Sequence, residues 1–188
     1  MTTMSLPRAA RLTAGLARRH KVITGVIALF IVAAIAVTLA TSGSSGPPSY
    51  PAAPGFTLSA LGQPGQQVSL SQYRGKPVII NFWASWCPPC QQETPLLASW
   101  YRQQNGHVVL LGLDENDTAA SALKFAKAKG VSYPIGFDPE VTVALAYNVD
   151  GLPQTFFLNA DHRIVDHVIG AVTTAELAKG LSLMNSAS

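Results

Sequence analysis

Charged residues are scarce in this chain of 188 residues, where they make up 12% of the sequence; roughly a quarter is usual in soluble domains. No acidic residue precedes Glu93, whereas five of the 13 basic residues lie within residues 1–21. Residues 22–188 therefore carry 8 basic and 10 acidic side chains, a net charge of −2, and the overall +3 comes from the N-terminal tail. A folded part without excess positive charge argues against nucleic-acid binding.

Cysteine is also scarce, because Cys87 and Cys90 are the only two in the chain. This number excludes a small domain held together by several disulfides. A hydrophobic content of 48% excludes a long disordered chain. The sequence therefore predicts a domain with its own core and one cysteine pair.

The longest apolar run lies at residues 22–40, where 16 of 19 residues are apolar and none is charged. As a helix this run would span about 28 Å, close to the ~30 Å thickness of a bilayer's hydrocarbon core. Basic residues precede it, and the next charged residue after it is Arg74. This asymmetry predicts a cytoplasmic basic tail (residues 1–21), a single transmembrane signal-anchor and a domain on the outer face of the membrane.

A cleaved signal peptide is the alternative interpretation of residues 22–40. Signal peptides usually have a shorter apolar region, of about 7–15 residues, and Thr38-Leu39-Ala40 is only a passable cleavage site. Residues 41–54 are rich in glycine, serine and proline and carry no charge. We interpret them as a linker that leads to a domain at residues 55–188.

Strand and helix patterns alternate within residues 55–188. Strands are expected at 56–61, 66–70, 77–83, 107–113, 154–159 and 163–169, and helices at 91–104, 118–129, 141–147 and 174–184. Trp83 is expected in the core. This order predicts an α/β sandwich with a mixed sheet.

The two cysteines lie in the segment Trp86-Cys87-Pro88-Pro89-Cys90, after a predicted strand and at the start of a predicted helix. A helix N-terminus stabilises the negative charge of a thiolate. Prolines are tolerated there, because the first N–H groups of a helix have no partner within it. Two intervening residues allow Cys90 to fold back and form a disulfide with Cys87.

A Cys-x-x-Cys motif alone is a weak signal, because it also forms half of many zinc sites. The candidate histidines are His107, His162 and His167, whose intervals fit no zinc module. We interpret them as surface residues and predict no metal ligands. A purely structural disulfide would close a very short loop and stabilise little.

Several separated motifs together resemble the thioredoxin superfamily, and more closely its membrane-anchored TlpA/ResA/DsbE-type thiol–disulfide oxidoreductases. They are residues 81–90 (NFWASWCPPC), Glu93, Pro95 and residues 151–156 (GLPQTF). The resemblance covers residues 50–185. It implies a thioredoxin-like α/β fold, in which helices flank a mixed central sheet, with an N-terminal β-hairpin and a βα insertion around residues 114–137.

The resemblance also implies roles for individual residues. Cys87 corresponds to the exposed nucleophile and Cys90 to the resolving cysteine. Pro153 matches a cis-proline that faces the disulfide, although the residues alone would favour an ordinary trans proline. The backbone of Leu152 can then pair with an extended substrate segment. Trp86 adjoins Cys87 and belongs either to the docking surface or to the core.

Glu93 follows Cys90 by three residues and lies on the same helix face. The resemblance implies that it sits under the disulfide and tunes the pKa of the cysteines. The alternative is an acidic residue that the helix dipole favours in the first turn. Asn81 stands where plain thioredoxins carry a buried aspartate and cannot shuttle a proton, which favours the tuning role. Pro95, inside the helix, is expected to be structural.

The activity implied is thiol–disulfide exchange outside the cytoplasm, without a cofactor. We expect a protein-disulfide reductase that a membrane-bound dithiol donor keeps reduced, with cytochrome c maturation as its pathway and apocytochrome c among its substrates. A DsbE-like disulfide-forming oxidase is the alternative, although Gln154 after the proline is closer to the ResA/TlpA pattern. A peroxiredoxin-like peroxidase or a copper chaperone would need different cysteine motifs.

Overall fold

The computed structural model describes residues 49–187. The predicted basic tail and transmembrane segment lie outside these residues. No helix within the described range is long and apolar enough to cross a membrane. Residues 50–54, which the sequence assigned to the linker, instead contact the C-terminal hairpin: Ala53 N–H donates to the carbonyl of His162 (2.9 Å), and Ile164 N–H donates to the carbonyl of Pro51 (2.9 Å). The folded region therefore begins near Tyr50.

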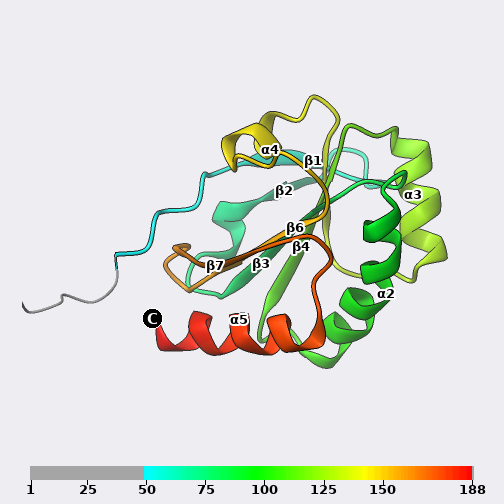
Figure 1. Cartoon of the computed structure of the whole chain (residues 1–188). Coiled ribbons are helices and arrows are strands. Elements are labelled where there is room, and N and C mark those ends of the chain that lie inside the picture. The colour runs from blue at the N-terminus through cyan, green and yellow to red at the C-terminus, as the bar shows by residue number, and fades with distance from the viewer. Residues whose placement is uncertain (1–48, 188) are drawn as a thin grey trace, which may run out of the picture. The chain divides into compact units, whose positions relative to one another are not determined.

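Seven strands form one mixed sheet in the order β2-β1-β5-β4-β3-β6-β7 (Figure 1). Their bounds are β1 Thr57–Ala60, β2 Gln67–Ser69, β3 Val78–Trp83, β4 Val109–Glu115, β5 Ile135–Asp138, β6 Gln154–Leu158 and β7 Ile164–Ile169. Strand β4 runs parallel to β3 and to β5, and the other pairs are antiparallel. The mixed sheet and the N-terminal hairpin β1–β2 are confirmed.

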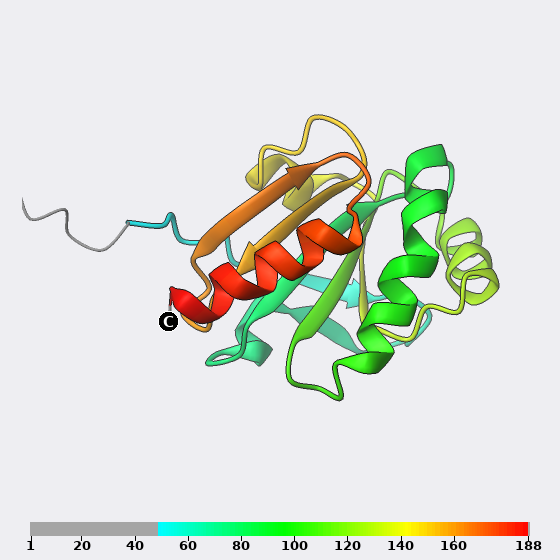
Figure 2. The same ribbon diagram turned by 60° about the horizontal axis from the view of Figure 1, so that its bottom comes forward.

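Helices cover both faces of the sheet (Figures 1 and 2). They are α2 Pro88–Gln103, α3 Ala119–Ala128, α4 Thr142–Ala146 and α5 Thr174–Ser186, with a short 3₁₀ helix, η1, at Leu70–Tyr73. Successive side chains of a strand point to opposite faces. Thus Ile79 of β3 packs with α2 and α5, whereas Ile80 and Phe82 pack with α4.

The centre of the domain differs from the sequence prediction in two places. Strand β4 continues past the predicted end at Leu113 into Asp114 and Glu115, and β5 is a strand that the apolar pattern did not predict. Both differences arise from pairing: Asp114 lies opposite Trp83 of β3, and Glu115 lies opposite Asp138 of β5. The inserted unit consists of α3 and β5, between β4 and α4, within the region that the sequence indicated.

Candidate active site

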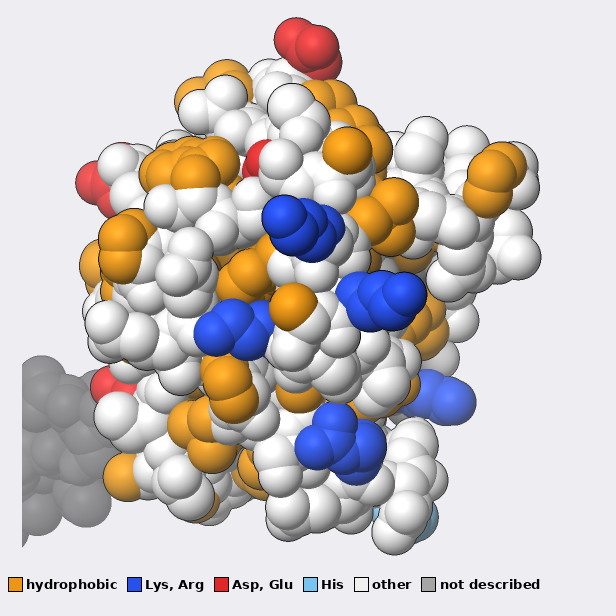
Figure 3. Space-filling view, turned by 90° about the vertical axis from the view of Figure 1, so that its right-hand side faces the viewer, with side chains coloured by type: hydrophobic (Ala, Val, Ile, Leu, Met, Phe, Trp, Pro, Cys, Tyr) orange, Lys and Arg blue, Asp and Glu red, His pale blue; other side chains and the backbone are white. Residues whose placement is uncertain are grey.

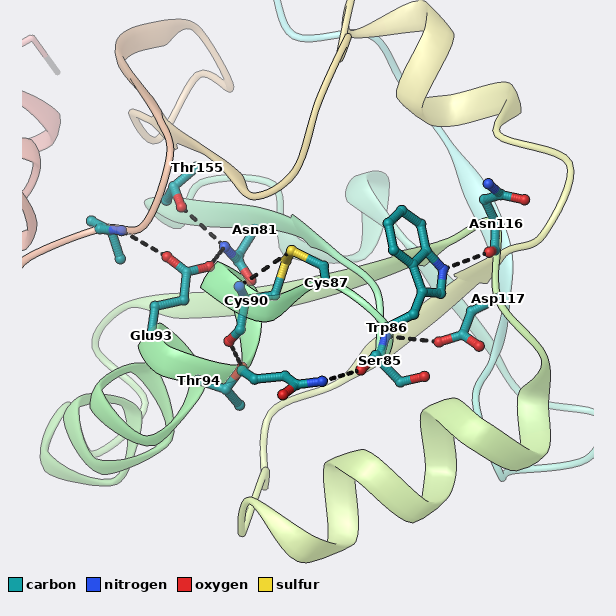
Figure 4. Close-up of a disulfide and its surroundings, with 12 residues drawn as sticks. Asn81, Ser85, Trp86, Cys87, Cys90, Glu93, Thr94, Asn116, Asp117 and Thr155 are labelled. Carbon is teal, nitrogen blue, oxygen red and sulfur yellow. Dashed lines mark hydrogen bonds between the residues drawn. A yellow bond between two sulfur atoms is a disulfide. The ribbon is translucent and has the colours of Figure 1, made fainter.

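The two cysteines lie at the start of α2, just after the end of β3 (Figure 4). A turn follows β3, in which Cys87 N–H donates to the carbonyl of Ala84 (3.2 Å). Cys87 is the N-cap of α2, Pro88 and Pro89 occupy its first positions, and Cys90 N–H donates to Cys87 Sγ (3.2 Å). A thiolate at Cys87 would therefore be stabilised by an N–H group and by the positive end of the helix dipole.

Cys87 and Cys90 are joined in a disulfide with an S–S distance of 2.05 Å. The expectation that Cys87 is exposed is wrong for this oxidised form, because its exposed fraction is 2% and that of Cys90 is 0%. Both sulfurs belong to an apolar cluster that includes Trp83, and Leu152 packs against that cluster.

Trp86 marks the surface beside the disulfide, with an exposed fraction of 54%. The core alternative for this side chain is therefore wrong. Its indole N–H donates to the backbone carbonyl of Asn116 (2.9 Å), which fixes the ring against the loop after β4 (Figure 4).

The loop before β6 brings a third segment to the disulfide. The Leu152–Pro153 peptide bond is cis, as the resemblance implied. Among the described residues, neither the N–H nor the C=O of Leu152 has a hydrogen-bond partner. A surface hollow of about 250 Å³ adjoins this loop, and its lining includes Trp86, Leu145, Val149 and Leu152.

Glu93 is buried on α2, with an exposed fraction of 3%. Its carboxylate accepts hydrogen bonds from Asn81 Nδ2 (2.8 Å) and from Val172 N–H (2.7 Å), and Asn81 also donates to Thr155 Oγ1 (3.1 Å) (Figure 4). Burial raises the pKa of Glu93 to about 7, and repulsion from Glu176 adds to the rise, while the two hydrogen bonds oppose it. The group can thus gain or lose a proton near neutral pH.

A second group of carboxylates, which sequence reasoning missed, lies at the end of β4. Asp117 accepts hydrogen bonds from the backbone N–H groups of Ser85 (2.8 Å) and Thr118 (2.6 Å). Asp114 is completely buried, and neither of its oxygens has a hydrogen-bond donor within residues 49–187. Burial raises the pKa of Asp114 to about 8, and repulsion by Asp117 and by Glu115 adds to the rise. A pattern in which acidic residues directly follow an apolar strand could have indicated this group.

The candidate histidines lie in other parts of the described structure. His107 is exposed, His162 bonds to the carbonyl of Tyr73 (3.0 Å), and His167 bonds to Gln154 Oε1 (2.9 Å). Within residues 49–187, no three histidine, cysteine or acidic side chains are arranged to hold a metal ion.

Comparisons with known proteins connect this site to a redox family. The model of the AhpC/TSA family matches residues 51–167. The chain is 30% identical over 171 residues to the thiol-disulfide oxidoreductase ResA of Bacillus subtilis (strain 168), covering 89% of this chain and 94% of that protein. It is 35% identical over 130 residues to ResA of Geobacillus kaustophilus (strain HTA426), covering 69% and 74%.

Solved structures show the same fold. A putative protein disulfide isomerase from Bacteroides thetaiotaomicron is 30% identical, with a TM-score of 0.63, and the match covers 74% of this chain and 89% of that one. A putative thiol:disulfide interchange protein DsbE from Chlorobium tepidum is 22% identical, with a TM-score of 0.65, and the match covers 76% and 100%.

Proposed function

Because the chain belongs to the AhpC/TSA family and is a thiol–disulfide oxidoreductase of the TlpA/ResA/DsbE type, we propose that it is a protein-disulfide reductase that acts outside the cytoplasm. Cys87 is its nucleophile and Cys90 its resolving cysteine. The observation that carries this proposal is the placement of the cysteines, since Cys87 caps α2 and receives the N–H of Cys90. This arrangement stabilises a thiolate at Cys87 rather than at Cys90.

The reaction consists of two exchange steps. The Cys87 thiolate attacks one sulfur of a partner disulfide, so that a mixed disulfide forms and the other partner sulfur leaves as a thiolate. The Cys90 thiolate then attacks Cys87 Sγ, which releases the second partner thiolate and closes the Cys87–Cys90 disulfide. Two electrons pass to the partner, and a dithiol donor must return two electrons to this protein.

Glu93 serves in this scheme as the group that tunes the pKa of the cysteines. It lies one helical turn after Cys90, is buried, and changes its charge near neutral pH. A neutral Glu93 permits a negative charge on the nearby sulfurs, whereas an ionised one opposes it.

Trp86, Leu152 and Pro153 bind the partner. The free backbone groups of Leu152 are available to an extended segment, and the cis-proline offers no competing N–H. The exposed indole of Trp86 supplies apolar contact beside Cys87.

The cellular arrangement is proposed from the sequence. Residues 1–21 form the cytoplasmic tail, residues 22–40 anchor the chain in the cell membrane, and the residues that follow up to the folded region tether the catalytic domain on the outer face. A membrane protein with a dithiol supplies electrons. The substrates are protein disulfides, apocytochrome c among them, and the pathway is cytochrome c maturation.

The reduction potential of the Cys87–Cys90 pair tests the direction of this reaction. The purified chain in detergent would be equilibrated against thiol buffers, with a Cys87→Ser, Cys90→Ser variant as the control without the redox pair. We expect a potential near or below about −250 mV, in the range of thioredoxin. A value near about −120 mV, like that of the strong oxidant DsbA, would contradict the reductase and support the disulfide-forming oxidase.

A further inference from the structure

The loop that carries the cis-proline is closed by the side chain of Gln154, which follows this proline at the start of β6. Gln154 has an exposed fraction of 0%, and its Nε2 donates to Oδ1 of Asp150 (2.9 Å). These two residues flank the segment Gly151-Leu152-Pro153. One side-chain hydrogen bond therefore joins the two ends of the segment that presents the Leu152 backbone.

A second hydrogen bond fixes the amide of Gln154 from the side of β7, the edge strand that pairs with β6. Its Oε1 lies 2.9 Å from Nε2 of His167. The His167 ring stacks on Phe156, with 4.0 Å between the ring centroids and 11° between the ring planes, which holds the imidazole in place. Directly after β7, Gly170 N–H donates to the carbonyl of Pro153 (2.9 Å). The end of β7 therefore holds the cis-proline loop at two points.

The order of donors and acceptors along these bonds follows from the carboxylate at one end. An ionised carboxylate only accepts hydrogen bonds, so Asp150 faces the NH₂ group of Gln154. The carbonyl oxygen of Gln154 then faces His167 and also only accepts, so the proton of the neutral imidazole lies on Nε2. Burial lowers the pKa of His167, while the charges of Asp166 and Asp150 oppose this change, so the ring is neutral at about pH 8.

The hydrogen bond from Gln154 is the side-chain contact that holds Asp150. No ion pair within residues 49–187 includes Asp150, because the ion pair found there joins Lys179 and Asp166. On the side of the molecule that carries α2 and α3, lysine and arginine side chains are dispersed over the surface (Figure 3). An amide, rather than a basic side chain, therefore fixes the first residue of the loop.

We propose that His167, Gln154 and Asp150 form a hydrogen-bonded relay that positions the cis-proline loop for pairing with an extended, disulfide-bearing segment of the partner. The three are positioning residues, since they act through the backbone of Leu152 and not on the sulfurs. The inference rests on the proposed function, because it names what presents the backbone groups that bind the partner.

Loss of the relay would weaken binding of an extended partner more than it slows the exchange itself. A loop that is not held must be ordered when the partner binds, and this ordering costs affinity. The thiolate of Cys87 is stabilised at the start of α2, which the relay does not contact. A small disulfide reaches Cys87 without pairing to Leu152, so its reduction should not depend on the relay.

The first test follows single turnovers of the reduced full chain in detergent with two substrates, a short peptide that carries an intramolecular disulfide and hydroxyethyl disulfide. In Asp150→Ala, the half-saturating peptide concentration should rise about tenfold, which corresponds to one hydrogen bond to a charged group. The limiting rate and the rate with hydroxyethyl disulfide should stay the same. Gln66→Glu, at an exposed position, is the control and should change neither substrate.

An unchanged half-saturating peptide concentration in Asp150→Ala would overturn the proposal. A wild type that reduces neither substrate would instead overturn the proposed function, and the role of the relay in binding with it.

The second test inverts the polarity of the bond between residues 150 and 154. Gln154→Glu keeps an acceptor toward His167 but places a carboxylate opposite Asp150, so the half-saturating peptide concentration should again rise about tenfold. Adding Asp150→Asn supplies an amide donor to the introduced carboxylate and should restore the wild-type value. Adding Asp150→Ala removes the repulsion without supplying a donor and should not restore it. Equal values for the two double variants would contradict the relay.

The third test needs no partner and uses the oxidised chain. Ring-nitrogen NMR at about pH 8 should place the proton of the neutral His167 ring on Nε2. In Asp150→Ala this preference should be lost, because the amide of Gln154 can then turn either its oxygen or its nitrogen toward the ring. The exposed His107 is the internal control and should be the same in both chains. A wild-type His167 with its proton on Nδ1 would overturn the proposal, whatever the direction of electron flow.

Discussion

Glu93 on α2 and Asp114 at the end of β4 are both buried carboxyl groups, yet their surroundings differ. Glu93 receives hydrogen bonds from Asn81 and from Val172, and its pKa rises to about 7. Asp114 receives none from the described residues, has Asp117 as a neighbour, and its pKa rises to about 8 from a lower ordinary value. Burial raises both pKa values, but hydrogen-bond donors limit the rise for Glu93, whereas neighbouring carboxylates add to it for Asp114.

The largest expected effect is a loss of folding stability when the carboxylate of Glu93, which accepts two buried hydrogen bonds, is removed. Glu93→Ala leaves Asn81 Nδ2 and Val172 N–H buried without their acceptor and creates a cavity, so the free energy of unfolding should fall by about 3 kcal/mol. Urea unfolding at pH 7 measures this change. Glu140→Ala is the matched control, since Glu140 is exposed, and it should cost less than about 0.5 kcal/mol. Similar losses in the two variants would show that the donors around Glu93 contribute little.

A smaller effect is expected in the pH dependence of stability. A carboxyl group whose pKa is raised by folding holds its proton more tightly in the folded state, so stability falls as the pH rises from about 4 to the raised pKa and is level above it. The Glu93 contribution should level off near pH 7 and the Asp114 contribution near pH 8. Asp114→Asn should therefore gain more than about 1 kcal/mol relative to the wild type between pH 5 and pH 8. Urea unfolding of the oxidised chain at both pH values measures this gain, and a stability difference that is the same at both would contradict the assignment.

The smallest effect concerns a single donor. Asn81→Ala removes the side-chain hydrogen bond that opposes the rise in the Glu93 pKa. The pKa of Glu93 should therefore rise further, so that its proton dissociation constant falls by up to about tenfold, while the pKa of Asp114 stays unchanged. Carboxyl NMR titration of the oxidised chain would follow both groups. Thr155→Val is the control, because Thr155 contacts Asn81 but has no hydrogen bond to Glu93. An equal shift in both variants would mean that the donor itself does not set the pKa.

Local patterns gave most of the fold correctly. The run at residues 77–83 became the fully buried β3. The apolar face of residues 118–129 became α3, with Ala122, Phe125 and Ala126 buried. The local pattern did not show strand β5, because its four residues (IGFD) are too short to show a period, and only the resemblance implied an inserted unit in this region. Its pairing with β1 and β4 stabilises it as a strand, although its own sequence shows no strand pattern.

The features of the candidate site also fall into two groups, those set by local sequence and those set by tertiary packing. The sequence by itself determined the Cys-Pro-Pro-Cys motif at a helix N-terminus and the position of Glu93 one turn later, because these depend on spacing along one segment. Only the tertiary structure decided that Cys87 is buried, that Val172 N–H reaches Glu93, and that Asp117 holds Ser85. These contacts join segments 32 or more residues apart in the chain. Such contacts leave no local period in the sequence, and burial, which sets the pKa of a carboxyl group, exists only once those segments have packed.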